Sequence, residues 1–116
     1  MNTRRVGSEK EEEACRYLEE KGYEIVTTNY RCRDAEIDIV AGDGRTLVFV
    51  EVKYRKNTEY GSGAHAVSVK KIRNISRCAR YYIYKEHVPA DVPMRFDVIA
   101  IDGDTVTHLI NAFEVL

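Results

Sequence analysis

The stretch TLVFVEVKYR, residues 46–55, constrains the fold more than any other part of the chain. Side chains alternate between the two faces of a strand. One face therefore carries three valines, and the other carries Leu47 and Phe49 followed by Glu51 and Lys53. Apolar residues on both faces are typical of a strand that is covered on both sides. We therefore expect a central strand in a sheet flanked by helices, with two charged groups at its C-terminal end.

Turn and cap signals divide the rest of the chain into helices and strands. Ser8 and Glu11 have the spacing of a capping box, Gly22 is a helix stop, and Ser68 caps a second helix. The predicted elements are a helix at 8–21, strands at 23–29, 35–41 and 46–54, a helix at 68–86, and strands at 94–101 and 105–110. The order αβββαββ predicts an α/β protein with a central mixed sheet of about five strands flanked by helices. A chain of 116 residues fits a single domain, 1–116.

Two carboxylates are predicted to meet where the second and third strands form a hairpin. Glu36 and Asp38 share one face of the second strand, and the isoleucines at 37 and 39 share the other. The hairpin can bring Asp38 beside Glu51, where the two charges repel each other unless a cation or a proton lies between them. Oxygen ligands of this kind suit Mg²⁺ or Mn²⁺.

Lys53 follows Glu51 by two residues, so it can orient an attacking water or offset negative charge on a phosphorane beside such a metal. The alternative is an ion pair at the rim of the sheet with no catalytic meaning. The pattern Glu-x-Lys does not decide between the two by itself.

The basic residues are concentrated in one segment, although the formal net charge of the chain is only −1. Residues 53–85 hold nine Lys or Arg and one acid, a balance that suits a polyphosphate partner. On the predicted second helix the basic residues lie opposite an apolar stripe, and exposed tyrosines among them could stack on unpaired bases. The alternative is a solvated helix face that is basic. The candidate nucleic-acid-binding residues are Arg55, Lys70, Lys71, Arg73, Arg77 and Arg80.

Longer stretches of the chain carry a resemblance to a known family. The segments NYRCRDAEIDIVAGDGRTLVFVEVKYR, GSGAHAVSVKKI, RFDVIAID and INAF are similar to the YraN-like uncharacterised bacterial family. Asp38 followed by Glu51-Val-Lys53 resembles the signature of the PD-(D/E)XK nuclease superfamily. The family is regarded as a distant relative of archaeal Holliday junction resolvases. The resemblance implies a restriction-endonuclease-like core with a metal-dependent nuclease site.

The resemblance also implies roles for individual residues. Asp38 and Glu51 match the metal-binding acids of the superfamily, and Lys53 matches its catalytic lysine. Glu11 matches a glutamate of the first helix that completes the metal site in the resolvase relatives. Lys71 is a candidate for the further polar residue that this helix often supplies to the active site in related nucleases.

Two acids have alternative explanations. Glu11 either closes the capping box or lies with Ala14 and Leu18 on the inner side of the first helix, toward the metal. Glu36 is either a second acid beside Asp38 or the partner of a nearby arginine, Arg31 or Arg33.

Several classes of protein and site are excluded or disfavoured. No apolar run reaches the length of a membrane span, and the polar start MNTRRVGSEKEEE is unlike a signal peptide. The three cysteines are far apart and are interpreted as reduced thiols of a cytoplasmic protein. Ser62 and His65 are interpreted as loop residues, Asp97 as a structural partner of Arg95, and the remaining histidines as lacking companions at ligand spacing.

Two functions from different classes follow from these patterns. The first is a Mg²⁺-dependent endonuclease that acts on DNA, including branched or distorted structures. The second is a non-catalytic nucleic-acid-binding module that retains the nuclease fold. Because relatives that cut junctions are dimers, a homodimer is among the expected assemblies.

Overall fold

The structure is a computed structural model that describes residues 5–55 and 67–114. Its elements follow one another in the predicted order, and their bounds are α1 (Arg5–Glu20), β1 (Glu24–Cys32), β2 (Ala35–Asp43), β3 (Thr46–Arg55), α2 (Val69–Lys85), β4 (Met94–Asp102) and β5 (Thr105–Phe113). The strands form one five-stranded sheet in the order β1-β2-β3-β4-β5. Of the neighbouring strands in the described residues, only β3 and β4 are parallel, so this mixed sheet with the two described helices confirms the predicted α/β class.

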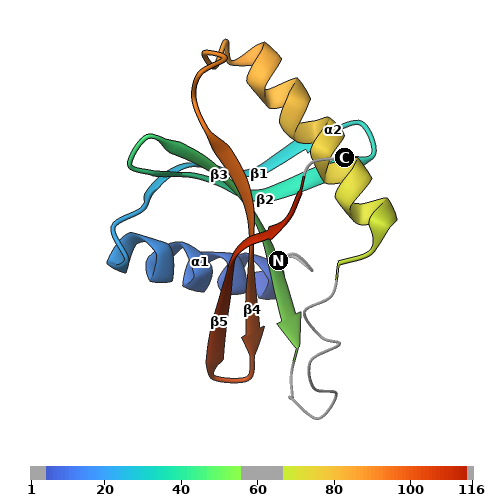
Figure 1. Cartoon of the computed structure of the whole chain (residues 1–116). Helices are drawn as coiled ribbons and strands as arrows, with labels where there is room; N and C mark the ends of the chain where they lie inside the picture. The colour runs from blue at the N-terminus through green and yellow to red at the C-terminus, as the bar shows by residue number, and fades with distance from the viewer. Residues whose placement is uncertain (1–4, 56–66, 115–116) are drawn as a thin grey trace.

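The two helices cover opposite faces of the sheet, with β3 between them (Figure 1). Val48 and Val50 are buried in a core cluster with Ala14 and Leu18 of α1. Phe49 is buried on the other side, in a cluster with side chains of α2. The prediction of a strand buried on both faces is therefore confirmed. Burial of each large apolar side chain contributes about 1.5–3 kcal/mol, so the two clusters hold β3 firmly in place.

The second helix begins and ends as predicted, but the first begins earlier. The Ser68 hydroxyl accepts a hydrogen bond from the Lys71 amide at 3.1 Å, which makes it the N-cap of α2. α1 already begins at Arg5, so Ser8 lies inside the helix and the predicted capping box is wrong. An N-cap contributes only about 1 kcal/mol, which an additional helical turn can outweigh. Gly22, with a φ of +96°, ends α1 as predicted.

The cysteines differ from the prediction. Cys32 at the end of β1 and Cys78 of α2 form a disulfide, with their Cα atoms 5.8 Å apart, and Cys15 is a free thiol. The interpretation of three reduced thiols is therefore wrong for two of them. The reason is that α2 packs on the β1–β2 hairpin and joins positions 46 residues apart, which spacing alone does not predict. Cysteine usage thus no longer supports a reducing compartment.

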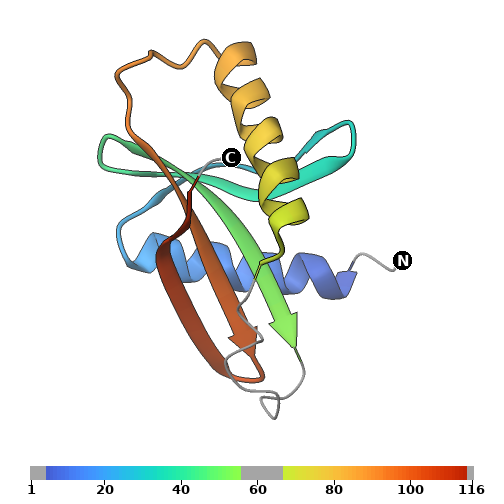
Figure 2. The ribbon, with the colours of Figure 1, turned by 45° about the vertical axis from the view of Figure 1, so that its right-hand side comes forward.

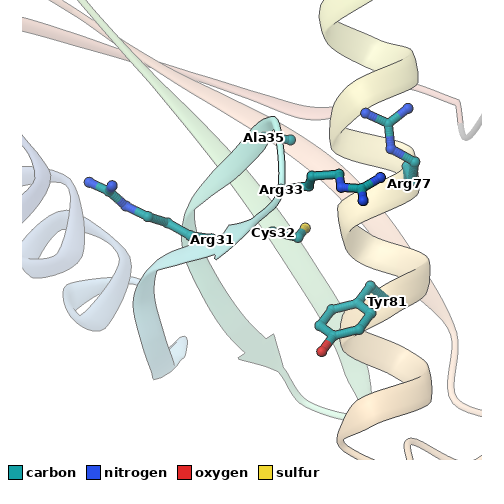
Figure 3. Close-up of a pocket in the computed structure, with 6 residues that line it drawn as sticks. All are labelled: Arg31, Cys32, Arg33, Ala35, Arg77 and Tyr81. Atoms are coloured by element: carbon teal, nitrogen blue, oxygen red, sulfur yellow. The ribbon is translucent and has the colours of Figure 1, made fainter.

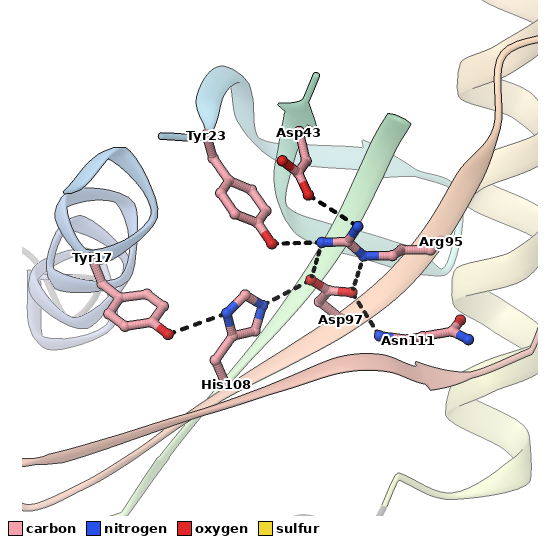
Figure 4. A network of polar contacts seen from close by, with 7 residues as sticks. All are labelled: Tyr17, Tyr23, Asp43, Arg95, Asp97, His108 and Asn111. Atoms are coloured by element: carbon pink, nitrogen blue, oxygen red, sulfur yellow. Dashed lines mark hydrogen bonds and ion pairs between the residues drawn. The ribbon is translucent and has the colours of Figure 1, made fainter. Parts of the chain in front are cut away.

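A buried polar network joins α1 to β4 and β5 (Figure 4). Asp97 is fully buried and accepts hydrogen bonds from Arg95 (3.0 Å) and from the Asn111 amide (2.9 Å). His108 lies 2.8 Å from the same carboxylate and 3.3 Å from the Tyr17 hydroxyl. Burial alone would raise the pKa of Asp97, but these contacts outweigh it and lower the pKa. The network confirms the structural interpretation of Asp97.

Neither described helix is long and apolar enough to cross a membrane. Ser62 and His65 lie outside the described residues, so the structure does not bear on their predicted place in a loop.

Candidate metal centre

The site begins where β2 and β3 separate. Their ladder runs from the turn to the pair Ile39 and Val50. Two residues further along β3, the Val52 amide donates a hydrogen bond to Asp38 Oδ2 at 2.8 Å. A carboxylate thus replaces a backbone carbonyl as the hydrogen-bond acceptor and is fixed beside β3. The hairpin therefore brings Asp38 to the central strand, as the sequence predicted.

One detail of β2 was predicted wrongly. Ile39 packs in the cluster with α1, whereas Ile37 packs in the cluster with α2, so these two residues do not share a face. The strand turns over between them because it has left β3, and the neighbouring Asn29 of β1 has a φ of +52°. Figure 2 shows the β1–β2 turn diverging from the C-terminal end of β3. As a result, Glu36 approaches α1.

Three carboxylates from two elements come together here. Glu11 of α1 and Glu36 and Asp38 of β2 each offer an oxygen, and these oxygens lie within 4.8 Å of one another. We call these three residues the acidic cluster. The Asn29 amide group donates to Glu11 Oε1 at 2.8 Å and to Glu36 Oε2 at 2.7 Å. Glu36 also lies 3.8 Å from Arg31, so both predicted roles of Glu36 correspond to contacts in the structure.

Sequence reasoning did not find Asn29. Its side chain donates hydrogen bonds to two acids, yet in the sequence it looks like the last residue of a strand. The available signal is weak: asparagine tolerates a positive φ better than most residues, and such positions often lie at functional sites.

Glu51 approaches Asp38 from β3. Its side chain is only 8% exposed, and Lys71 of α2 places Nζ 2.9 Å from Glu51 Oε2. Burial alone would lower the pKa of Lys71, but the hydrogen bond and charge of Glu51 raise it above its ordinary value. Lys71 therefore leans toward the sheet, as its position beside the apolar stripe predicted.

Burial and the neighbouring acids together raise the pKa of Asp38. Burial raises its pKa from 3.8 to about 7, and the charge of Glu51 is the next cause. The Val52 amide opposes the shift, while Glu11 and Glu36 add to it. A carboxyl group with this pKa is partly protonated near neutral pH, and a cation could take the place of the proton. The all-oxygen donor set fits a hard divalent cation such as Mg²⁺ or Mn²⁺.

Lys53 lies on β3 two residues beyond Glu51, and its side chain is half-buried. The parallel ladder with β4 continues without interruption through Lys53 and Ala100. Because side chains alternate along a regular strand, Lys53 projects on the same face as Glu51.

The predicted basic face of α2 is exposed. Ile75, Ala79 and Tyr82 are buried against the sheet, and the helix contains no acid. Arg55 is the last residue of β3, and its side chain lies outside the described part of the chain. The exposed basic residues of this face are Lys70, Arg73, Arg77 and Arg80.

The fold and the site together define an α/β protein with carboxylates gathered at an opening in a mixed sheet. The model of the Uncharacterised protein family UPF0102 matches residues 10–101, and the chain belongs to this family. The resemblance to an uncharacterised bacterial family is thereby confirmed.

Proteins of this family from three bacteria match over most of their length. A UPF0102 protein of Lachnoclostridium phytofermentans is 46% identical over 114 residues, which cover 98% of this chain and 97% of that protein. One from Geobacter sulfurreducens is 45% identical, covering 95% and 89%. One from Legionella pneumophila is 40% identical, covering 97% of both.

Proposed function

We propose that this protein is a metal-dependent endonuclease of the PD-(D/E)XK type that acts on DNA, including branched or distorted structures. One observation carries the proposal: carboxylates from α1, β2 and β3 converge on Asp38, whose pKa rises to about 7. Such a site is unfavourable unless a cation or a proton compensates the charge. The mixed sheet flanked by two helices agrees with the restriction-endonuclease-like core that the resemblance implies.

In this proposal Asp38, Glu51 and Glu11 hold Mg²⁺ or Mn²⁺, and Glu36 joins them as a fourth acid. When bound, the cation would polarise a phosphodiester and lower the pKa of a water molecule. Asp38 has a fixed support, since the Val52 amide donates a hydrogen bond to its carboxylate at 2.8 Å. Pre-organised ligands of this kind avoid reorganisation during the reaction.

Lys71 and Lys53 have different roles in this proposal. Lys71 Nζ, at 2.9 Å, fixes the orientation of the Glu51 carboxylate. Lys53, on the same strand face as Glu51, offsets the negative charge that develops on the phosphoryl oxygens. The exposed basic face of α2 then binds the backbone of the nucleic acid.

A second candidate function rests on the same ion pair. Because Lys71 already compensates one oxygen of Glu51, the site has a partial internal counter-ion and could exist without a metal. A non-catalytic nucleic-acid-binding module would show this feature.

Cleavage assays separate the two functions. Four-way junction, flap, single-stranded and duplex DNA are incubated with Mg²⁺ or Mn²⁺ and either the wild type, Asp38→Asn or Lys53→Ala. Asp104→Asn, an exposed acid in the β4–β5 turn, is the matched control. An endonuclease requires cleavage that both site variants lose and the control keeps. Binding without cleavage supports the module, and equal nicking by wild type and Lys53→Ala indicates a contaminating nuclease.

A further inference from the structure

A cavity of about 470 Å³ lies between the β1–β2 turn and α2, outside the metal centre. Figure 3 shows its walls. We call it the arginine pocket, and its lining residues are Arg31, Cys32, Arg33, Ala35, Arg77 and Tyr81. Its size falls within the range of small-ligand sites.

The charges of the arginine pocket are unbalanced. Among the described residues, three arginines line it and no acidic residue does. Arg31 is partly compensated, because it lies 3.8 Å from Glu36 and extends away from the cavity in Figure 3. Arg33 and Arg77 extend toward the same gap, and Arg77 donates a hydrogen bond to the neutral Asn74 side chain at 3.2 Å. Like charges at such a place are stabilised by an anion.

An aromatic ring completes the pocket. The Tyr81 side chain is 43% exposed, although Tyr30 lies beside it with ring centroids 6.5 Å apart. A phenol ring that lines the same cavity as Arg33 and Arg77 can stack a base while the arginines bind its phosphate. Tyr84, on the same helix, is 78% exposed and does not line the cavity.

The two walls of the pocket are tied together. The disulfide between Cys32 and Cys78 joins the end of β1 to α2 directly beside the cavity. The pocket therefore exists before a ligand arrives, which reduces the entropic cost of binding.

We propose that the arginine pocket binds one unpaired nucleotide of a nucleic-acid strand, with its phosphate on Arg33 and Arg77 and its base on Tyr81. The inference rests on the proposed function only in taking nucleic acid as the partner, and it needs no metal. It extends that function by selecting strands with an unpaired nucleotide. Glu36 connects the two places, because it belongs to the acidic cluster and also contacts Arg31.

The test is a binding titration in EDTA. Binding is measured by the fluorescence anisotropy of a labelled oligothymidylate and of a labelled blunt duplex. Tyr81→Ala should weaken oligothymidylate binding by about fivefold or more, the lower range for loss of one base stack. Tyr81→Phe, which keeps the ring, should bind like the wild type. Tyr84→Ala is the matched control and should change the affinity for oligothymidylate by less than about twofold.

A second pair of variants tests the phosphate contact. Arg33→Gln should weaken binding. It should also reduce the slope of the logarithm of the binding constant against the logarithm of the salt concentration by about one, because one phosphate contact is lost. Arg45→Gln, an exposed arginine in the β2–β3 turn, should leave both unchanged.

The proposal is overturned if Tyr81→Ala and Tyr84→Ala behave alike, or if Tyr81→Ala weakens duplex binding as much as oligothymidylate binding. Either result leaves the proposed nuclease intact, because cleavage is measured separately. Conversely, absent cleavage together with a specific effect of Tyr81→Ala refutes the nuclease and retains the pocket.

Discussion

Asp38→Asn should stabilise the protein in the absence of divalent metal, although it removes a proposed metal ligand. The amide oxygen of asparagine can still accept the hydrogen bond that the Val52 amide donates to Asp38 at 2.8 Å, so the substitution keeps this hydrogen bond. The substitution removes the charge that burial and Glu51 make unfavourable. Sites of function often carry such a cost in stability.

The magnitude follows from the pKa of Asp38, which rises from 3.8 to about 7 on folding. Between these values the folded protein keeps a proton that the unfolded chain has lost, so the free energy of unfolding falls as pH rises. Each tenfold change in proton affinity corresponds to about 1.4 kcal/mol, which sets an upper limit of about 4 kcal/mol. This loss of stability is complete above the pKa of Asp38 in the folded protein, about 7, and absent below its value in the unfolded chain, 3.8.

Urea denaturation in EDTA, followed by circular dichroism from about pH 4 to about pH 8, measures the effect. The variant should exceed the wild type in stability near pH 8 and match it near pH 4. Excess Mg²⁺ should then stabilise the wild type alone. Asp104→Asn, in an exposed turn, controls for loss of a negative charge. The reasoning is refuted if Asp38→Asn is no more stable than the wild type near pH 8, or if the difference does not depend on pH.

Three further predictions concern other parts of the molecule. Lys71→Met should cost about 1 kcal/mol in EDTA, because Glu51 loses a half-exposed partner; a loss no larger than that of Lys70→Met would contradict this. Thiol titration of unreduced, denatured protein should find one free thiol, and reduction should cost up to about 4 kcal/mol for the loop of 46 residues; three free thiols would disprove the disulfide. Asp97→Asn should cost about 3 kcal/mol by chemical denaturation, since it removes the buried charge that Arg95 contacts at 3.0 Å and leaves Arg95 with the more exposed Asp43 as its charge partner at 3.1 Å, whereas a change under 1 kcal/mol would show that the network contributes little.

Much of the fold could be predicted because local signals agreed with each other. The alternation in residues 46–55 identified a strand buried on both faces, and Ser68 marked the start of α2. The capping box at Ser8 failed because one hydrogen bond competes with the gain from a longer helix. The pair Cys32 and Cys78 was missed because it depends on how α2 packs on β1.

The candidate site was predictable only in part, for a related reason. The hairpin register leads from the sequence to Asp38 beside Glu51, since a short turn fixes which residues face each other. The positions of Glu36 and Asn29 depend on β2 turning over after it leaves β3, and strict alternation predicts the opposite. Departures from regular strand geometry are therefore where the structure adds most to the sequence.

The central claim is that the carboxylates around Asp38 bind a divalent cation, and calorimetric titration with Mn²⁺ at neutral pH tests it most directly. Because the pKa of Asp38 is about 7, binding should displace a proton, so the measured heat should depend on the ionisation enthalpy of the buffer. The account predicts that Asp38→Asn loses both the tight binding and the proton release, while Asp104→Asn keeps them. Equal Mn²⁺ affinity for the wild type and Asp38→Asn would contradict it.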